Sequence, residues 1–308
     1  EAHGARLAPQ FTARAVVLTN VMLDDLERFQ SMDRVAEMLG EIADRATELV
    51  VINEDDASLH AIAAASAARG VAVGRYGVAD AVLAGQPHGL GYARVAPTRL
   101  APADGCLVST VQGTSAELVL HRHTIEITLP ARGTHFAVDA AAALEAARLI
   151  LGERFAPATA VTAMNAVEPV FGRGETVTIR DQQIDFVLVQ NPASFPLNLD
   201  VVGGEHEVLF LAIGEEEHDP SWLWTVHPAA LRRVDIAAGP KAQDLAVRLL
   251  HAGVEVDVIE RDLHAAFERF LALPTPASGR KTAMFTASQM RELRRVHGLV
   301  KAELEGAH

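Results

Sequence analysis

Strand patterns and helical patterns alternate along the first half of the chain. Short apolar runs at residues 13–20, 48–56 and 71–78 predict strands, and the first two of these runs end in polar side chains. Amphipathic or alanine-rich runs at 33–46 and 59–70 lie between them and predict helices. This alternation is typical of an α/β domain with a parallel sheet.

The pattern changes from about Gly85 to Arg132. Short stretches of alternating apolar and polar residues, such as 105–113 and 116–130, predict a small antiparallel insertion. Residues 133–152 then predict one long helix that ends at a glycine.

The second half restarts with a hairpin pattern at residues 176–192. Strand patterns then alternate with helical patterns, which is typical of a doubly wound, Rossmann-like sheet. We therefore predict two domains, residues 1–152 and residues 153–308. The strand patterns are 207–214, 232–239 and 254–260, and the helical patterns are 240–253, 262–273 and part of 281–296.

Length and composition agree with two hydrophobic cores. The chain has 308 residues, more than one core usually organises, and 49% of them are hydrophobic. Its formal net charge of −13 comes without a basic stripe, which argues against nucleic acid and anionic membrane surfaces as partners. No apolar run reaches the roughly 18 residues of a membrane span, so we expect no membrane insertion.

Cys106 is the single cysteine of the sequence. One cysteine excludes an internal disulfide and any zinc site built from cysteine pairs, so no zinc is expected. It also fits a reducing compartment, and we expect a cytoplasmic protein. The sequence starts at Glu1 rather than at a methionine, which fits a piece of a longer polypeptide.

Polar residues follow the first predicted strand. Asn20, Asp24 and Asp25 lie just past its end, where ligands of an α/β sheet usually collect. Oxygen ligands suit Mg²⁺, so Asp24 and Asp25 are candidate metal ligands and Asn20 is a candidate cofactor contact. The alternative is a solvated helix N-terminus, where the helix dipole favours acidic side chains.

A second polar group ends the strand predicted at 48–56. Asn53, Asp55 and Asp56 could line the same cleft and contact a cofactor. Asp and Asn are also good N-caps, so these residues could instead cap a helix that starts near Ser58. The sequence leaves both interpretations open.

Two histidines lie close together in the antiparallel region. His121 and His123 are two residues apart in a predicted strand and would share one face. A third metal ligand is not evident, so we favour exposed sheet residues over a metal site. The sequence contains no G-x-S-x-G motif, so nothing supports a serine hydrolase.

Seven segments, taken in order, resemble the Mur ligases, and among them the MurT-type synthetase subunits of lipid II isoglutaminyl synthase. The resemblance covers nearly the whole chain, and the asparagine–proline and tryptophan segments point to the MurT type. The segments are “VLTNVMLDDLERF” (17–29), “INEDD” (52–56), “GTHFAVDAAAALEAA” (133–147), “FGRGE” (171–175), “QNPASF” (190–195), “DPSWLW” (219–224) and “AAGPKAQDLAVRLLHAGV” (237–254).

The resemblance implies an N-terminal segment, a central ATPase domain and a C-terminal Rossmann-like domain. Such enzymes use ATP and Mg²⁺ to activate a carboxylate as an acyl phosphate. The MurT type amidates the D-glutamate of lipid II with ammonia released by a glutaminase partner, GatD. The first residues of this chain correspond to a point inside the central domain, so the phosphate-binding glycine loop ending in Lys-Thr is expected upstream of this sequence.

The resemblance also assigns nucleotide contacts. Arg173 would reach the phosphates and serve catalysis, although an arginine between glycines is otherwise a plain turn residue. His135 and Asp139, in the adenine-reading helix, are candidate cofactor contacts, and so are the strand-end residues Asn20, Asn53 and Asp56. Phe136 and Asp139 replace two asparagines of the family there, and each lost amide costs about 1 to 3 kcal/mol, so ATP binding is expected to be weak. The loop 214–222 is also shorter than in the family, and the acid expected at the ribose has no clear counterpart.

The tryptophan segment points to a partner. In the MurT type the acid before “SWLW” completes the Cys-His pair of the glutaminase, so the resemblance implies that Asp219 is catalytic in another chain. Trp222 and Trp224, as alternate residues of an extended stretch, would share one face and bind that partner. The alternative is that both rings pack in the domain core.

Three functions follow as hypotheses. The first is the synthetase subunit of a glutamine-dependent amidotransferase that acts on lipid II with ATP. The second is a degenerate scaffold or activator that binds a glutaminase without ATP turnover, which the replaced adenine contacts favour. The third is a ligase for a different carboxylate substrate.

Overall fold

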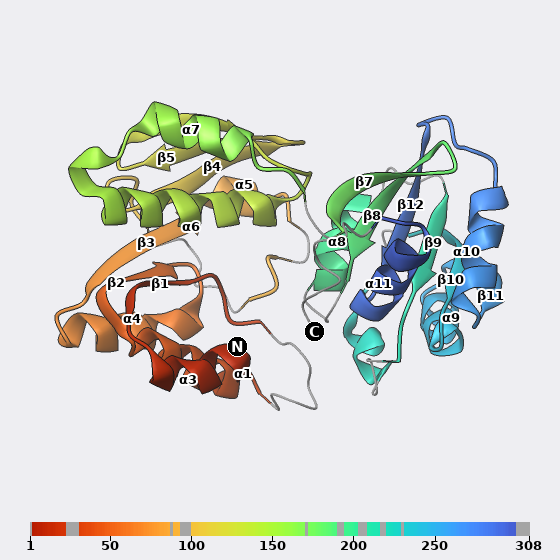
Figure 1. The fold of residues 1–308 in the computed structure, drawn as a ribbon, viewed down its shortest axis with the longest axis horizontal. Helices are drawn as coiled ribbons and strands as arrows, with labels where there is room; N and C mark the ends of the chain where they lie inside the picture. The colour runs from red at the N-terminus through yellow and green to blue at the C-terminus, as the bar shows by residue number, and fades with distance from the viewer. Residues whose placement is uncertain are drawn as a thin grey trace. The chain divides into compact units, whose positions relative to one another are not determined.

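The chain forms two compact units, Glu1–Glu168 and Pro169–His308 (Figure 1). Our computed structural model describes residues 2–22, 31–86, 89–92, 100–169, 172–189, 194–202, 208–215, 220–228 and 231–299.

Within these residues, the first unit contains a six-stranded sheet in the order β1-β2-β3-β4-β5-β6. Strands β1 to β4 are parallel, whereas β4-β5 and β5-β6 are antiparallel pairs, so the predicted antiparallel insertion continues the parallel sheet. The strands are β1 (Ala13–Leu18), β2 (Ala46–Asn53), β3 (Ala72–Val78), β4 (Cys106–Gln112), β5 (Ser115–Leu120) and β6 (His123–Thr128), and the helices are α1 (Ala2–Leu7), α3 (Met32–Ala43), α4 (His60–Ala68), α5 (Asp80–Leu83), α6 (Thr134–Leu151) and α7 (Pro157–Asn165).

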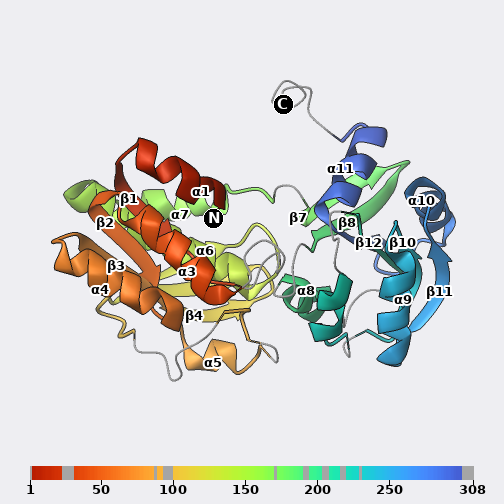
Figure 2. The same ribbon diagram turned by 90° about the horizontal axis from the view of Figure 1, so that it is seen from below.

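Helices cover both faces of this sheet (Figure 2). On one face, α3 and α4 bury the apolar side chains of β1 and β2, with Val16, Val50 and Ile52 in the same cluster as Met38. On the other face α6 lies close to β3, because Gly74 has no side chain there. A Cβ at Gly74 would lie 2.4 Å from Leu149 Cδ1. Helix α3 has a helical apolar periodicity because one of its faces packs on the sheet. Strand β2 is a continuous apolar run because both faces of the sheet are covered.

Helix α7 belongs to the first unit. It packs against β6, and Asn165 Oδ1 accepts a hydrogen bond of 2.7 Å from the Thr128 N–H. The first unit therefore runs to Glu168, beyond the expected boundary after Gly152.

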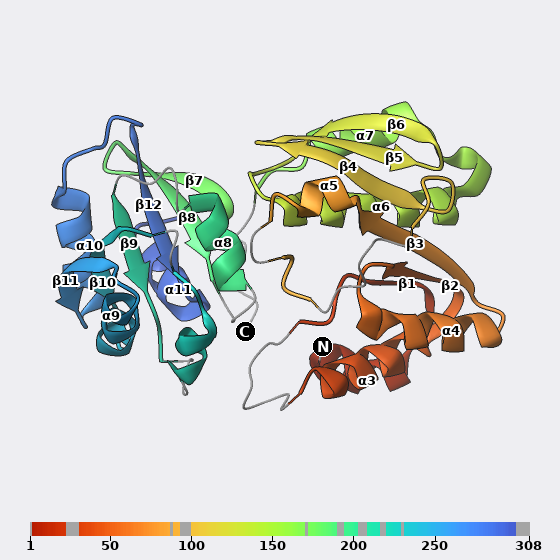
Figure 3. The same cartoon turned by 180° about the vertical axis from the view of Figure 1, so that it is seen from behind.

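The described part of the second unit has a six-stranded sheet in the order β11-β10-β9-β12-β8-β7 (Figure 3). Strands β8 to β12 are parallel neighbours, and β7-β8 is the predicted hairpin. This is the doubly wound arrangement that the sequence indicates. The strands are β7 (Arg173–Ile179), β8 (Gln182–Leu188), β9 (Leu209–Ala212), β10 (Arg233–Ala238), β11 (Glu255–Glu260) and β12 (Arg280–Phe285), and the helices are α8 (Ser194–Val202), α9 (Ala242–His251), α10 (Leu263–Ala272) and α11 (Ala287–Val296).

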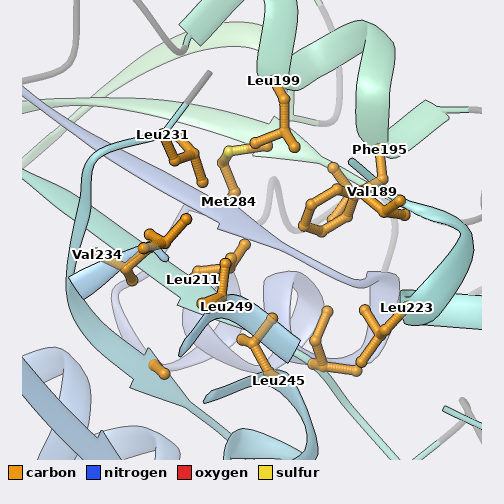
Figure 4. Close-up of a cluster of buried hydrophobic side chains, with 14 of the residues drawn as sticks. Val189, Phe195, Leu199, Leu211, Leu223, Leu231, Val234, Leu245, Leu249 and Met284 are labelled. Atoms are coloured by element: carbon orange, nitrogen blue, oxygen red, sulfur yellow. The ribbon is translucent and has the colours of Figure 1, made fainter. Parts of the chain in front are cut away.

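Two apolar clusters lie on opposite faces of the second sheet. Figure 4 shows the first, in which Phe195 and Leu199 of α8 and Leu245 of α9 pack against Leu211 and other strand residues. The second cluster joins α10 and α11 to alternate strand positions. Its members include Phe210, Phe267, Phe270, Phe285 and Met290. Alternation along β9 explains the division, since successive strand residues point to opposite faces.

None of the helices in the described parts of the chain combines the length and the apolar character that a membrane crossing needs.

Candidate functional site

The carboxyl ends of the first three strands form the candidate site of the first unit. Leu18 pairs with Ile52, and Asn53 pairs with Tyr76, so the ends of β1, β2 and β3 lie side by side. Asn20 follows β1 by two residues, and Asn53 is the last residue of β2. The sequence prediction that these two polar residues gather at one edge of the sheet agrees with this register.

Asn53 is fully buried, with 0% of its surface exposed. Its Oδ1 accepts a hydrogen bond of 3.1 Å from the Asp55 N–H, whereas its Nδ2 has no hydrogen-bond partner among the described residues. Alternation along β2 places this side chain on the face that α6 covers. An unpaired buried donor costs about 1 to 3 kcal/mol, so a ligand oxygen at Nδ2 would recover free energy.

The carboxylates of Asp55 and Asp56 are engaged by the backbone. Asp55 Oδ2 accepts from the Val78 N–H at 2.6 Å. Asp56 accepts from the Val21 N–H at 2.6 Å and from the Ser58 N–H at 2.9 Å, and it is the N-cap of the 3-10 turn Ala57–Leu59. Burial raises the pKa of Asp56. The capping interpretation is therefore confirmed for Asp56, and a direct contact with a cofactor stays a prediction.

The start of α6 belongs to the same edge of the sheet. Asp139 is close enough for its charge to help raise the pKa of the buried Tyr76, after the larger effect of burial itself. His135 lies four residues before Asp139, on the same helix face. Its ring centroid is 4.2 Å from that of Phe136. The N-cap, Gly133, offers no side chain to the first N–H groups of α6, and these groups favour an anion.

Arg173 is the first residue of β7 in the second unit, and it is exposed. Gly172 and Gly174 on either side have φ of 70° and 75°. Glu175 holds this turn, because its Oε2 accepts from the Gly172 N–H at 3.1 Å and from Arg294 Nη1 at 2.6 Å. The backbone of the arginine turn is thus fixed while its guanidinium faces outward.

The tryptophan segment differs from the prediction. Residues Pro220–Thr225 form a 3-10 helix, so the two rings do not share a face as they would in an extended stretch. Trp222 is 5% exposed and packs edge-on against Phe195 at 5.9 Å, as the core interpretation has it. Trp224 is 49% exposed, with Arg248 5.6 Å from its ring centroid. Only Trp224 of the pair offers a ring to a partner, and Asp219 lies outside the described residues.

Replacing the two tryptophans one at a time by phenylalanine tests this difference. We expect Trp222→Phe to lower the free energy of unfolding of the second unit by about 1 to 2 kcal/mol, because it leaves a cavity in the core. Trp224→Phe is the matched control and should change it by less than about 0.5 kcal/mol. Urea unfolding followed by far-UV circular dichroism measures both. Equal losses would contradict the assigned burial, as would equal fluorescence maxima of the two single-tryptophan variants.

The histidine pair differs from the prediction in part, since His123 is the exposed sheet residue that we favoured but His121 is not on a strand. His121 lies in the β5-β6 turn with φ of 46°, and its Nε2 lies 3.0 Å from Glu145 Oε2, whereas His123 is an exposed residue of β6. The two rings therefore do not share a strand face. The described residues contain no group of three or more His, Cys, Asp or Glu that could hold a metal ion. The predicted Mg²⁺ ligands Asp24 and Asp25 lie outside the described residues.

Tyr76 is a component of this edge that sequence reasoning missed. Its ring is fully buried, and its hydroxyl bonds to the carbonyls of Leu18 and Thr19 at 3.0 and 2.8 Å. The one available signal was a tyrosine in a strand whose other residues, apart from Arg75, are small or apolar, in a chain that has only two tyrosines.

Comparison with known proteins agrees with this architecture. Residues 2–147 match the family model “Mur ligase middle domain”. Three solved structures share the fold of nearly the whole chain. A pseudomurein peptide ligase type C from Methanothermus fervidus is 13% identical, with a TM-score of 0.69, and the match covers 96% of this chain and 65% of that one. MurF ligase from Thermotoga maritima in complex with ADP is 17% identical, with a TM-score of 0.62, and the match covers 99% of this chain and 65% of that one. Folylpolyglutamate synthase from Mycobacterium tuberculosis with ADP and AMPPCP is 17% identical, with a TM-score of 0.64, and the match covers 93% of this chain and 64% of that one.

The chain spans less than two thirds of the length of each of these structures. Residues 2–147 match the Mur ligase middle domain, and the two units have the folds of the middle and C-terminal domains of Mur ligases.

Proposed function

We propose that this chain is part of an ATP-dependent carbon–nitrogen ligase of the Mur type. The observation that supports it most directly is the buried, unpartnered Nδ2 of Asn53 at the carboxyl edge of the first sheet. The start of α6 lies at the same edge, where the helix dipole and N–H groups favour anions. Proteins with this fold have been solved with ADP and AMPPCP, so a nucleotide is the ligand that fits.

In this proposal ATP supplies the phosphoryl group that activates a carboxylate. Asn53 donates a hydrogen bond to an oxygen of the nucleotide, and the start of α6 with His135 and Asp139 binds beside it. Arg173, exposed on its rigid turn, supplies positive charge to the phosphates. No ligand set for Mg²⁺ is assigned, because the described residues contain no suitable cluster.

The finer proposal is the MurT-type reaction. The chain amidates the D-glutamate of lipid II with ammonia from a GatD-like glutaminase, in the cytoplasm. The motifs “QNPASF” and “DPSWLW” support this assignment. So does the exposure of Trp224, which lies five residues after Asp219, the acid proposed to complete the glutaminase.

A specific observation favours a second candidate, a scaffold that binds the glutaminase without ATP turnover. Both carboxylate oxygens of Asp56 accept hydrogen bonds from backbone N–H groups. Phe136 and Asp139 stand where the family has asparagines. Fewer side chains are then available to read the nucleotide than in the family.

Titration of the full-length natural protein with Mg-ATP separates the two candidates. We expect binding by the wild type, and we expect Asn53→Ala to weaken it by about tenfold through loss of one hydrogen bond to a charged group. Gln112→Ala, at an exposed position of β4, is the control and should leave affinity unchanged. A wild type that binds no nucleotide would contradict the ligase proposal and favour the scaffold.

A further inference from the structure

The backbone around Asn20 is held by side chains of other elements. Strand β1 ends at Leu18, so its ladder to β2 no longer fixes the residues that follow. The Tyr76 hydroxyl bonds to the carbonyl of Leu18 at 3.0 Å and to that of Thr19 at 2.8 Å. On the other side of Asn20, Asp56 Oδ2 accepts from the Val21 N–H at 2.6 Å.

Both holding groups are themselves rigid. Tyr76 and Asp56 are fully buried. Tyr76 lies on β3, and its side chain reaches past β2 to the end of β1. The second oxygen of Asp56 is bound by the Ser58 N–H at 2.9 Å, so this carboxylate is anchored in the 3-10 turn. Neither group can move without breaking a buried hydrogen bond, which costs about 1 to 3 kcal/mol.

The chemistry of the two side chains matches what they hold. A phenol has one O–H, which here is shared between two carbonyl oxygens, whereas an ionised carboxylate only accepts and suits two N–H groups. An asparagine in place of Asp56 would turn an amide N–H toward one of the backbone N–H groups. A phenylalanine in place of Tyr76 would keep the ring and leave the two carbonyls without their donor.

We propose that Tyr76 and Asp56 are positioning residues that fix the backbone on both sides of Asn20 and so hold its side chain at the edge where Asn53 and α6 lie. The effect on nucleotide affinity rests on the function proposed above. Asp56 then serves the site through Asn20 instead of touching the nucleotide.

Amide hydrogen exchange tests the positioning itself, without any ligand. In full-length protein, Tyr76→Phe is expected to speed exchange at Val21 and its neighbours by about tenfold, with exchange in β6 unchanged. Unchanged exchange near Val21 would overturn the proposal. This measurement tests the positioning role of Tyr76 even if the wild type binds no nucleotide. Absence of nucleotide binding would overturn only the proposed function.

A double-mutant cycle with Mg-ATP tests whether the two residues act through Asn20. We expect Asn20→Ala to weaken binding by about tenfold and Tyr76→Phe by about three- to tenfold. Combined with Asn20→Ala, Tyr76→Phe should cause no further loss, because the side chain it positions is gone. Losses that multiply would overturn the proposal in favour of general destabilisation. Asp56→Asn should behave as Tyr76→Phe does. If Asp56→Asn does not fold, the cycle of Tyr76→Phe with Asn20→Ala tests the proposal by itself.

Discussion

Replacing Lys281 by methionine is expected to lower the free energy of unfolding of the second unit by about 2 to 4 kcal/mol. Lys281 lies on β12 and is 1% exposed. Its Nζ donates to the carbonyls of Phe270, Leu271 and Leu273 at 2.9, 2.9 and 2.7 Å. These carbonyls lie at the end of α10, where the helix leaves carbonyls without intrahelical partners. The Phe270 carbonyl also accepts from the Leu273 N–H at 3.2 Å and the Leu271 carbonyl from Gln182 Nε2 at 3.1 Å. Methionine keeps the apolar stem but leaves all three acceptors without this donor.

Tryptophan fluorescence during urea unfolding measures this loss in one unit alone. Both tryptophans of the chain, Trp222 and Trp224, belong to the second unit. Lys241→Met is the matched control, because Lys241 is half-buried before α9, and it should change the free energy by less than about 0.5 kcal/mol. If Lys281→Met unfolds at the wild-type urea concentration, the three hydrogen bonds do not stabilise the unit as argued here.

Most strands and helices follow from burial patterns that the sequence displays. The strand predicted at 13–20 is β1, and the helix predicted at 133–152 is α6, because each has an apolar pattern with the period of its element. The domain boundary does not follow in this way. Helix α7 has no buried residues of its own and is tied to β6 by contacts that local pattern does not encode.

The candidate site was predictable only where topology alone determines it. Asn20 and Asn53 lie at one edge of the sheet because parallel strands end there. The contact of Tyr76 with Leu18 joins residues 58 positions apart, and no local pattern contains it. The same holds for the 3-10 helix of the tryptophan segment. Arg248, 25 positions after Leu223, donates from its Nε to the Leu223 carbonyl at 3.1 Å. Alternation could not reveal that the stretch is helical.

Replacing Arg173 by alanine is expected to lower the rate of ATP-dependent amide formation by about 10² to 10³, if the proposed function holds. A positive charge placed on the transferred phosphoryl group stabilises the transition state more than the ground state, so kcat should fall more than nucleotide affinity. Because Arg173 is exposed and Glu175 with Arg294 holds its turn, stability should change by less than about 0.5 kcal/mol.

A second arginine of the same hairpin provides the control. Arg180, in the β7-β8 turn, is exposed like Arg173, but its guanidinium is paired with both carboxylate oxygens of Glu268 at 2.7 and 2.8 Å. Arg180→Ala removes the same charge from the same hairpin and should leave the rate unchanged. A rate for Arg173→Ala within twofold of the wild type would make Arg173 a plain turn residue. Equal losses in both variants would point to the net charge of the hairpin, because only a specific contact with the phosphates separates the two arginines.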